Sequence, residues 1–211
     1  MNQRLKKSFK EDKKIWYIIA YILFTVITYE LFNRPFGNVH VIKIPFDDKI
    51  PFIKEMIIPY HTYLPMLIVV GLMLLYKDED LYIRYVMALF LAQITAYVIF
   101  MNFQTYVPRY DTNLLGDDIF SRIIRLTYSV DNTYSGAPSM HVCNSILASY
   151  YIGKSSYSKK CRVPMIAYLC FVASTTVFVK QHVFLDIPSG IIHAIISIIL
   201  VNLYFKNKEK K

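Results

Sequence analysis

Long apolar runs recur along the whole chain, and they constrain its fold more than any other feature. Hydrophobic residues make up 55% of the 211 residues, a larger share than soluble domains usually carry. A membrane-spanning helix needs roughly 20 predominantly apolar residues. Six runs approach this length, and they predict six spans at about 15–32, 59–76, 82–103, 140–157, 163–181 and 184–205.

The runs follow one another without a linker long enough to separate a second domain. We therefore expect an all-α, polytopic membrane protein with a single integral domain over 15–205, between basic tails at 1–14 and 206–211. The fourth run is the least apolar, because it contains Asn144 and Ser145. Half-hydrophilic helices of this kind are usually buried inside a bundle, away from lipid.

The distribution of Lys and Arg predicts the orientation of the chain. Six spans place both termini on one side of the membrane, together with the loops near 77–81 and 154–162, and sixteen of the 24 basic residues fall there. Cytoplasmic loops carry an excess of Lys and Arg, so we expect cytoplasmic termini in an integral protein of a bacterial-type plasma membrane. This asymmetry accounts for most of the +9 net charge, which therefore does not indicate a nucleic-acid partner.

Two long loops are predicted on the outer side. The loop at 33–58 mixes Pro, Phe and Ile with charged residues, which suggests a segment lying along the membrane surface. The loop at 104–139 contains apolar residues at helical spacing between 119 and 130. An interfacial helix and a lid over a site both fit that pattern.

Polar and ionisable side chains from three separate stretches are predicted to lie at the same outer face. Such residues are expensive near lipid, so their common depth argues for a shared site. They are Arg109 after the third span, Ser139, Met140 and His141 at the start of the fourth, and Lys180, His182 and Asp186 between the last two.

The residue types in these stretches suit one another chemically. His182 and Asp186 are four residues apart, and on a helix this spacing brings the carboxylate within reach of the imidazole. Such a hydrogen bond fixes the ring tautomer and leaves the other nitrogen free to attack an electrophile. His141 is a second imidazole that can give a proton to a leaving group.

The remaining candidates are suited to binding an anion. Arg109 and Lys180 are cations that can neutralise phosphate oxygens. Ser139 and the backbone N–H of Met140, at the start of a helix, offer further donors. Together these groups indicate phosphoryl transfer that needs neither a metal nor a cofactor.

Each residue taken alone has a simpler interpretation. A single histidine at a membrane interface is usually a polar anchor, Ser139 is a good helix cap, and Arg109 can extend towards lipid headgroups. Two histidines and an aspartate can also ligate zinc. The conjunction of the groups favours phosphoryl transfer over each of these alternatives.

Three short motifs carry a resemblance to a known family. Residues 137–142, APSMHV, resemble the second signature of the type-2 phosphatidic acid phosphatase superfamily, which comprises integral-membrane lipid phosphatases related to haloperoxidases. Residues 180–186, KQHVFLD, resemble its third signature. Residues 104–109, QTYVPR, are similar to the first signature as it stands in the branch nearer inositol phosphorylceramide synthases. The likeness covers roughly residues 60–205.

The resemblance implies a role for each matching position. His182 is implied to be the nucleophile that forms a phosphohistidine, with Asp186 orienting it and His141 protonating the leaving group. Phosphate oxygens are implied to be held by Ser139, the Met140 amide and Arg109.

The chain departs from the family pattern at two basic positions. The lysine of the first signature is replaced by Asn102, and the arginine of the third signature by Thr176. Lys180 is the candidate for the missing cation.

The leading hypothesis is a membrane lipid phosphatase that hydrolyses a lipid phosphomonoester or diphosphate at the outer face. The alternative is a transferase that moves a phosphorylated headgroup to a hydroxyl of another lipid. A third interpretation is a non-enzymatic transporter or scaffold whose polar residues line a path. The sequence leaves the identity of the lipid and the oligomeric state open.

Overall fold

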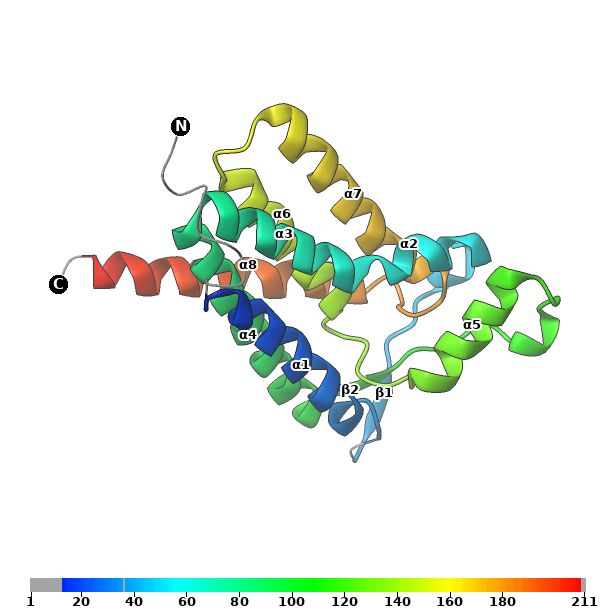
Figure 1. Ribbon diagram of the computed structural model, residues 1–211. Coiled ribbons are helices and arrows are strands. Elements are labelled where there is room, and N and C mark those ends of the chain that lie inside the picture. The colour runs from blue at the N-terminus through cyan, green and yellow to red at the C-terminus, as the bar shows by residue number, and fades with distance from the viewer. Residues whose placement is uncertain (1–12, 36, 210–211) are drawn as a thin grey trace.

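Each of the six predicted spans is largely helical, the second as two helices, and a further helix forms in the second long loop (Figure 1). The computed structural model describes residues 13–35 and 37–209, so most of the predicted N-terminal tail lies outside the described residues. The α-helices are α1 (Ile15–Phe32), α2 (Ile57–His61), α3 (Tyr63–Lys77), α4 (Glu79–Asn102), α5 (Ile119–Val130), α6 (Met140–Lys154), α7 (Lys159–Phe178) and α8 (Asp186–Lys208). Short 3-10 helices form at Pro45–Asp48 (η2), Lys54–Met56 (η3) and Thr112–Leu114 (η4).

Four helical segments of the described chain are both long and apolar enough to cross a membrane. They are Lys54–Lys77, Glu79–Asn102, Lys159–Phe178 and Asp186–Lys208. The apolar part of α1, Ile15–Tyr29, is shorter than these. These four segments identify the chain as an integral membrane protein. That α1 and α6 also cross the membrane stays a prediction.

Two short strands add to the predicted all-helical fold. Strand β1 (Val39–Val41) pairs in parallel with β2 (Gln104–Tyr106), in a register that places His40 opposite Thr105. The pairing joins the two outer loops and satisfies backbone groups that neither loop satisfies alone. Three residues are too few to show the alternation by which a strand is predicted, so the sequence analysis missed them.

Helix α6 packs against α3, α4, α7 and α8 in the middle of the bundle. Its polar residues Asn144 and Ser145 are fully buried, which confirms the prediction for the fourth apolar run. The Asn144 Nδ2 atom donates to the hydroxyl oxygens of Tyr21 (2.7 Å) and Tyr63 (2.6 Å). These bonds connect α6 to α1 and α3.

Gly190 allows the first turns of α6 and α8 to touch. A Cβ atom at this position would lie 2.7 Å from the backbone oxygen of Ser139 and 3.0 Å from Cβ of Val142. No other residue type fits at that separation without a backbone shift.

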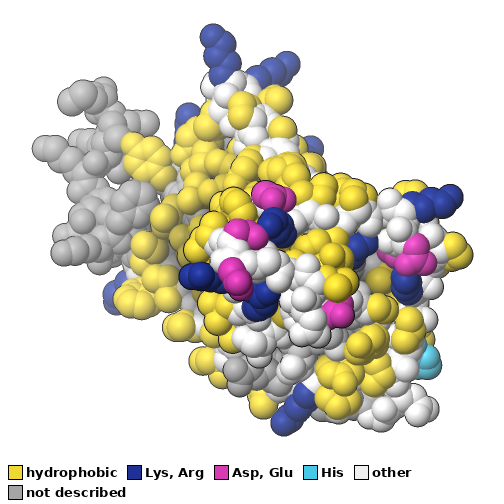
Figure 2. Space-filling view, turned by 90° about the vertical axis from the view of Figure 1, so that its right-hand side faces the viewer, with side chains coloured by type: hydrophobic (Ala, Val, Ile, Leu, Met, Phe, Trp, Pro, Cys, Tyr) yellow, Lys and Arg dark blue, Asp and Glu magenta, His cyan; other side chains and the backbone are white. Residues whose placement is uncertain are grey.

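The two long loops that are predicted to be on the outer side gather at one end of the molecule. In Figure 1, α2, α5 and the two strands lie at the right, whereas α8 runs away from them to the C-terminal end at the left. Figure 2 looks onto the loop end and shows Lys and Arg side chains next to Asp and Glu side chains, with hydrophobic side chains around them. This end carries the site described below.

Helix α5 confirms the amphipathic helix predicted in the second outer loop. Asp118 caps it, accepting hydrogen bonds from the backbone N–H groups of Phe120 (3.1 Å) and Ser121 (3.2 Å). One face is buried around Ile124, and an apolar face at Leu126 and Val130 is exposed. Whether that exposed face lies on a membrane surface stays a prediction.

Candidate active site

Two of the predicted stretches meet where α6 and α8 begin. Ser139 is the N-cap of α6, and its Oγ atom accepts a hydrogen bond from the Val142 N–H (3.4 Å). Asp186 is the first residue of α8, and the residues before it form a tight turn closed by a bond from the Asp186 N–H to the Val183 oxygen (3.0 Å). His182 directly precedes this turn and does not lie on a helix, which is a correction to the helical spacing expected from the sequence.

The turn nevertheless brings the His182 ring onto the Asp186 carboxylate. The Nδ1 atom of His182 is 2.9 Å from Oδ2 of Asp186, which has no exposed surface. Because a carboxylate accepts hydrogen bonds, Nδ1 carries the proton and Nε2 keeps its lone pair. That Nε2 atom is 3.1 Å from the Ser139 hydroxyl oxygen. The result is a hydrogen-bonded chain of Ser139, His182 and Asp186.

Gly136 makes room for this carboxylate. A Cβ atom at Gly136 would lie 2.8 Å from Oδ2 of Asp186 and 2.6 Å from Cγ2 of Val107. The backbone before α6 therefore presses directly against the aspartate that holds His182.

His141 lies next to this chain. Its ring centroid is 5.7 Å from that of His182, close enough for both imidazoles to contact one phosphate group. Tyr60 and Tyr63 lie against the other sides of the His141 ring, with centroid separations of 4.8 Å and 4.2 Å. The two tyrosine rings restrict the direction in which the imidazole can turn.

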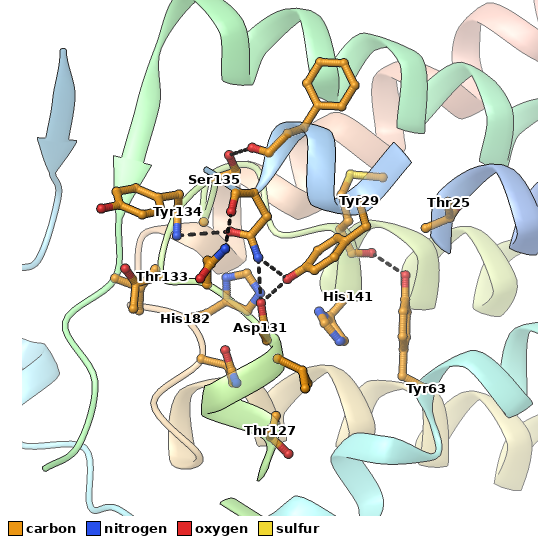
Figure 3. Close-up of a pocket in the computed structure, with 18 of the residues that line it drawn as sticks. Thr25, Tyr29, Tyr63, Thr127, Asp131, Thr133, Tyr134, Ser135, His141 and His182 are labelled. Atoms are coloured by element: carbon orange, nitrogen blue, oxygen red, sulfur yellow. Dashed lines mark hydrogen bonds between the residues drawn. The ribbon is translucent and has the colours of Figure 1, made fainter. Parts of the chain in front are cut away.

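Both histidines line a cavity of about 420 Å³ (Figure 3). Met140, which the sequence predicted at the phosphate, also lines it. In the described part of the chain, no Lys or Arg side chain belongs to the lining. Apart from its histidines and Asp131, the cavity wall consists of aromatic, aliphatic and neutral polar residues. Any charge on the wall therefore lies on these few side chains.

Asp131 is the acidic residue of the cavity wall that the sequence analysis missed. Its Oδ1 atom accepts hydrogen bonds from the Tyr29 hydroxyl and from Nδ2 of Asn33 (2.8 Å), as Figure 3 shows. Its other oxygen is 3.5 Å from NH2 of Arg109. The residue follows directly after α5 and has no spacing relation to either signature, so no local pattern revealed it.

Arg109 lies behind the cavity and binds the backbone around Asp131. Its guanidinium donates to the carbonyl oxygens of Asp131 (2.5 Å) and Asn132 (2.8 Å), and to Oε1 of Gln181 (2.7 Å). It also lies 4.6 Å from the Tyr128 ring centroid. Burial raises the pKa of Tyr128 to about 12, and the nearby guanidinium opposes that rise.

Lys180 is directed at the first outer loop. Its Nζ atom donates to the backbone oxygens of Asp47 (3.1 Å) and Ile50 (2.6 Å). Burial lowers the pKa of Lys180, and the carboxylates of Asp47 and Asp48 oppose this effect. The assignment of Lys180 to phosphate binding therefore stays a prediction and has no support from this geometry.

Three further residues of the site were missed by the sequence analysis. His61 lines the cavity, and its Nε2 atom is 2.9 Å from Oγ1 of Thr127. Gln181 lines it from the position before His182. Asp47 accepts a hydrogen bond from the Phe184 N–H (2.6 Å) and so joins the first outer loop to the third signature. Only Gln181 lies inside a recognised motif.

The zinc alternative requires a cluster of protein ligands. In the ranges that the structure describes, no group of three or more His, Cys, Asp or Glu residues is placed to hold a metal ion. The second imidazole of the site, His141, instead faces the ring of His182 edge to face.

The arrangement is a hydrogen-bonded chain of serine, histidine and aspartate with a second histidine beside it, at a cavity in a helical membrane protein. Comparison with known proteins gives the family. The family model described as the PAP2 superfamily matches residues 46–200, so the chain belongs to the PAP2 superfamily, a family of the phosphatase type. No curated protein and no solved structure matches the chain.

Proposed function

We propose that this protein is a membrane lipid phosphatase, independent of metal ions, that uses His182 as its nucleophile at the extracytoplasmic face. The hydrogen-bonded chain of Ser139, His182 and Asp186 beside His141 carries the proposal. Nucleophile, orienting carboxylate and general acid are all supplied by side chains, which is sufficient for transfer through a covalent intermediate.

The reaction on a lipid phosphomonoester has two steps. The Nε2 atom of His182 attacks phosphorus, the bond from phosphorus to the lipid oxygen breaks, and protonated His141 gives that oxygen its proton. Water then attacks the phosphohistidine, loses a proton to His141, and inorganic phosphate leaves as the P–N bond breaks. Asp186 stabilises the positive charge that the His182 ring acquires in the first step.

Six helices and the distribution of Lys and Arg support the proposed topology. Six helices cross the membrane, and the bonds from Asn144 on α6 to Tyr21 on α1 and to Tyr63 on α3 connect α1 and α6 to the bundle. Both tails are then cytoplasmic, and the loop end of Figure 1 is on the outer side. A lipid places its headgroup in the cavity while its tail stays among the apolar helices. Lipid phosphates are thus the class of substrate, and neither a cofactor nor a nucleic acid takes part.

A transferase of the same chemistry is the second candidate, and Asp131 favours it. A carboxylate in the cavity can accept a hydrogen bond from the hydroxyl of an acceptor lipid, which would then replace water in the second step. Product analysis with a donor labelled in its phosphate separates the two candidates. Free phosphate indicates hydrolysis, whereas a second labelled lipid indicates transfer.

The test of the proposal compares two histidine variants in detergent, His182→Ala and His40→Ala. His40 is exposed in the first long loop and stacks on Phe103. Because it lies outside the site, His40→Ala shows the effect of removing an imidazole that has no role in the reaction. We expect His182→Ala to lower kcat on a panel of lipid phosphates by at least about a thousandfold, and His40→Ala to retain it. The native protein should also yield an acid-labile phosphoprotein in the presence of EDTA. Full turnover by His182→Ala, or loss of turnover on chelation, would overturn the mechanism.

A further inference from the structure

Gln181 lines the cavity, and the NH₂ group of its side-chain amide has no hydrogen-bond partner among the described residues. The side chain is 5% exposed, and its Nε2 atom is buried without a partner. A buried donor in this state costs free energy unless a ligand satisfies it. Since Gln181 lines the cavity and adjoins His182 in the chain, the ligand that reaches the His182 ring is placed to do so.

Arg109 determines the orientation of the Gln181 side-chain amide. Its NH2 atom is 2.7 Å from Oε1 of Gln181, and a guanidinium has only donors. The amide oxygen must therefore face Arg109, and the NH₂ group must face away from it. The orientation of the Gln181 side chain follows from this contact alone.

The side-chain amide is not required for the local backbone. The turn before α8 is held by bonds from the Gln181 and His182 N–H groups to the Thr176 oxygen, at 2.9 Å and 3.2 Å. The Gln181 side chain adds one contact to Arg109 and leaves its two amide protons free. A purely structural glutamine would use both ends of its amide, as buried polar groups normally do.

We propose that the Gln181 amide binds a non-bridging oxygen of the phosphoryl group that His182 attacks, and that Arg109 is the positioning residue that holds this amide. The inference rests on the proposed function. It explains how a cavity without a Lys or Arg among its described lining residues can take an anion. The guanidinium acts on the phosphoryl group through the amide, which it polarises.

The experiment compares Gln181→Met with Gln93→Met, a matched change on another wall of the cavity. Gln93 on α4 is buried and accepts a hydrogen bond from the Tyr21 hydroxyl (3.3 Å). The probe is inorganic orthovanadate, whose trigonal bipyramidal adducts resemble phosphorus under attack. Its Kd is measured by vanadium NMR or calorimetry on the purified full chain in detergent.

We expect Gln181→Met to raise the orthovanadate Kd by about 10- to 100-fold, as for a lost hydrogen bond to a charged group. Gln93→Met should stay within about twofold of the native value. Gln181→Glu keeps the contact to Arg109 but puts a negative charge at the anion, and it should bind orthovanadate more weakly than Gln181→Met. An unchanged Kd in either Gln181 variant overturns the proposal, and Gln181→Glu decides the matter if Gln181→Met does not fold.

The role of Arg109 is tested by a double-mutant cycle. If Arg109 acts through Gln181, Arg109→Met should weaken orthovanadate binding in the native background, but change it by no more than about twofold in the Gln181→Met background. Additive losses would overturn the positioning role. Orthovanadate binding requires no turnover, so these results stand apart from the His182→Ala test. A Gln181-dependent Kd with no lipid hydrolysis would contradict the proposed reaction alone.

Discussion

The histidines and the cations of the loop end are held in different ways. His182 and His141 project into the cavity from the turn before α8 and from the first turn of α6, and short bonds and ring contacts fix their directions. Arg109 and Lys180 instead donate to backbone oxygens of neighbouring loops. The histidines thus line the cavity, while the cations are bonded to the backbone of the loops beside it.

This difference between the histidines and the cations shows that the contacts of a short side chain can be predicted more reliably from the sequence than those of a long one. Asp and His have few rotatable bonds, so the position of the backbone nearly determines what they contact. Lys and Arg span several ångströms of surface and form bonds with whichever oxygens lie within reach. Substitutions of the short Asp and His side chains should therefore mainly affect turnover, whereas substitutions of the long Lys and Arg side chains should mainly affect stability.

The largest effect is expected at the carboxylate behind His182. Asp186→Asn keeps the shape but allows the amide to stabilise the wrong ring tautomer, and we expect kcat to fall by about a thousand- to ten-thousandfold. Asp111→Asn is the same change at an exposed position outside the cavity, and it should leave kcat unchanged. Steady-state kinetics on a lipid phosphate gives the result. Equal activity in the two variants would remove Asp186 from the mechanism.

A smaller but still large effect is expected from a single methyl group at Gly136. Gly136→Ala must displace either Val107 or the Asp186 carboxylate, and a displacement of the catalytic geometry by about 1 Å can cost about a hundredfold in kcat. Gly116→Ala is the matched control, because its Cβ would meet its nearest atom at 3.7 Å. If the two alanine variants have the same kcat, the site is more tolerant than the packing indicates.

Ser139→Ala should lower kcat by roughly tenfold, because we expect the Ser139 hydroxyl to donate to a charged phosphate oxygen once Nε2 of His182 bonds to phosphorus. It should also lower stability by about 1 kcal/mol through loss of the α6 cap. Ser158 is the N-cap of α7 but makes no side-chain capping bond, so Ser158→Ala should change neither quantity. Kinetics together with thermal unfolding in detergent separates the two effects. A loss of stability without a loss of kcat would make Ser139 a cap only.

The smallest effect on turnover is expected at Lys180. Lys180→Met removes two bonds to the first outer loop, so we expect a loss of about 1–3 kcal/mol in stability and a kcat/KM close to the native value. Lys49→Met, at an exposed position of the same loop, should change neither. A tenfold or greater fall in kcat/KM at native stability would instead support the phosphate-binding role expected for Lys180 from the sequence.

The positions of most helices were predictable because the apolar runs approach the length of a spanning helix, although the second run forms two helices, α2 and α3. The polar content of the fourth run correctly indicated that Asn144 and Ser145 are buried. The strands at Val39–Val41 and Gln104–Tyr106 were not predictable, since each is three residues long and their pairing joins segments far apart in the sequence.

The site was predictable where its residues are close together in the chain. The contact between His182 and Asp186 follows from their spacing, although a turn forms it where a helix was assumed. Asp131 and His61 reach the cavity only through the folding of α5 and α2, and no periodicity encodes that. The directions of Arg109 and Lys180 depend on loop backbones whose course the sequence does not reveal.

The glycine at position 190 has a consequence for how the protein tolerates its surroundings. The first turns of the two helices that carry Ser139 and Asp186 rest on each other main chain to main chain, so no rotamer adjustment can alter their separation. We expect this distance to persist when a change of lipid or detergent loosens the side-chain packing. Any larger residue at 190 would push the helices apart from within, while every polar group of the cavity remained chemically intact.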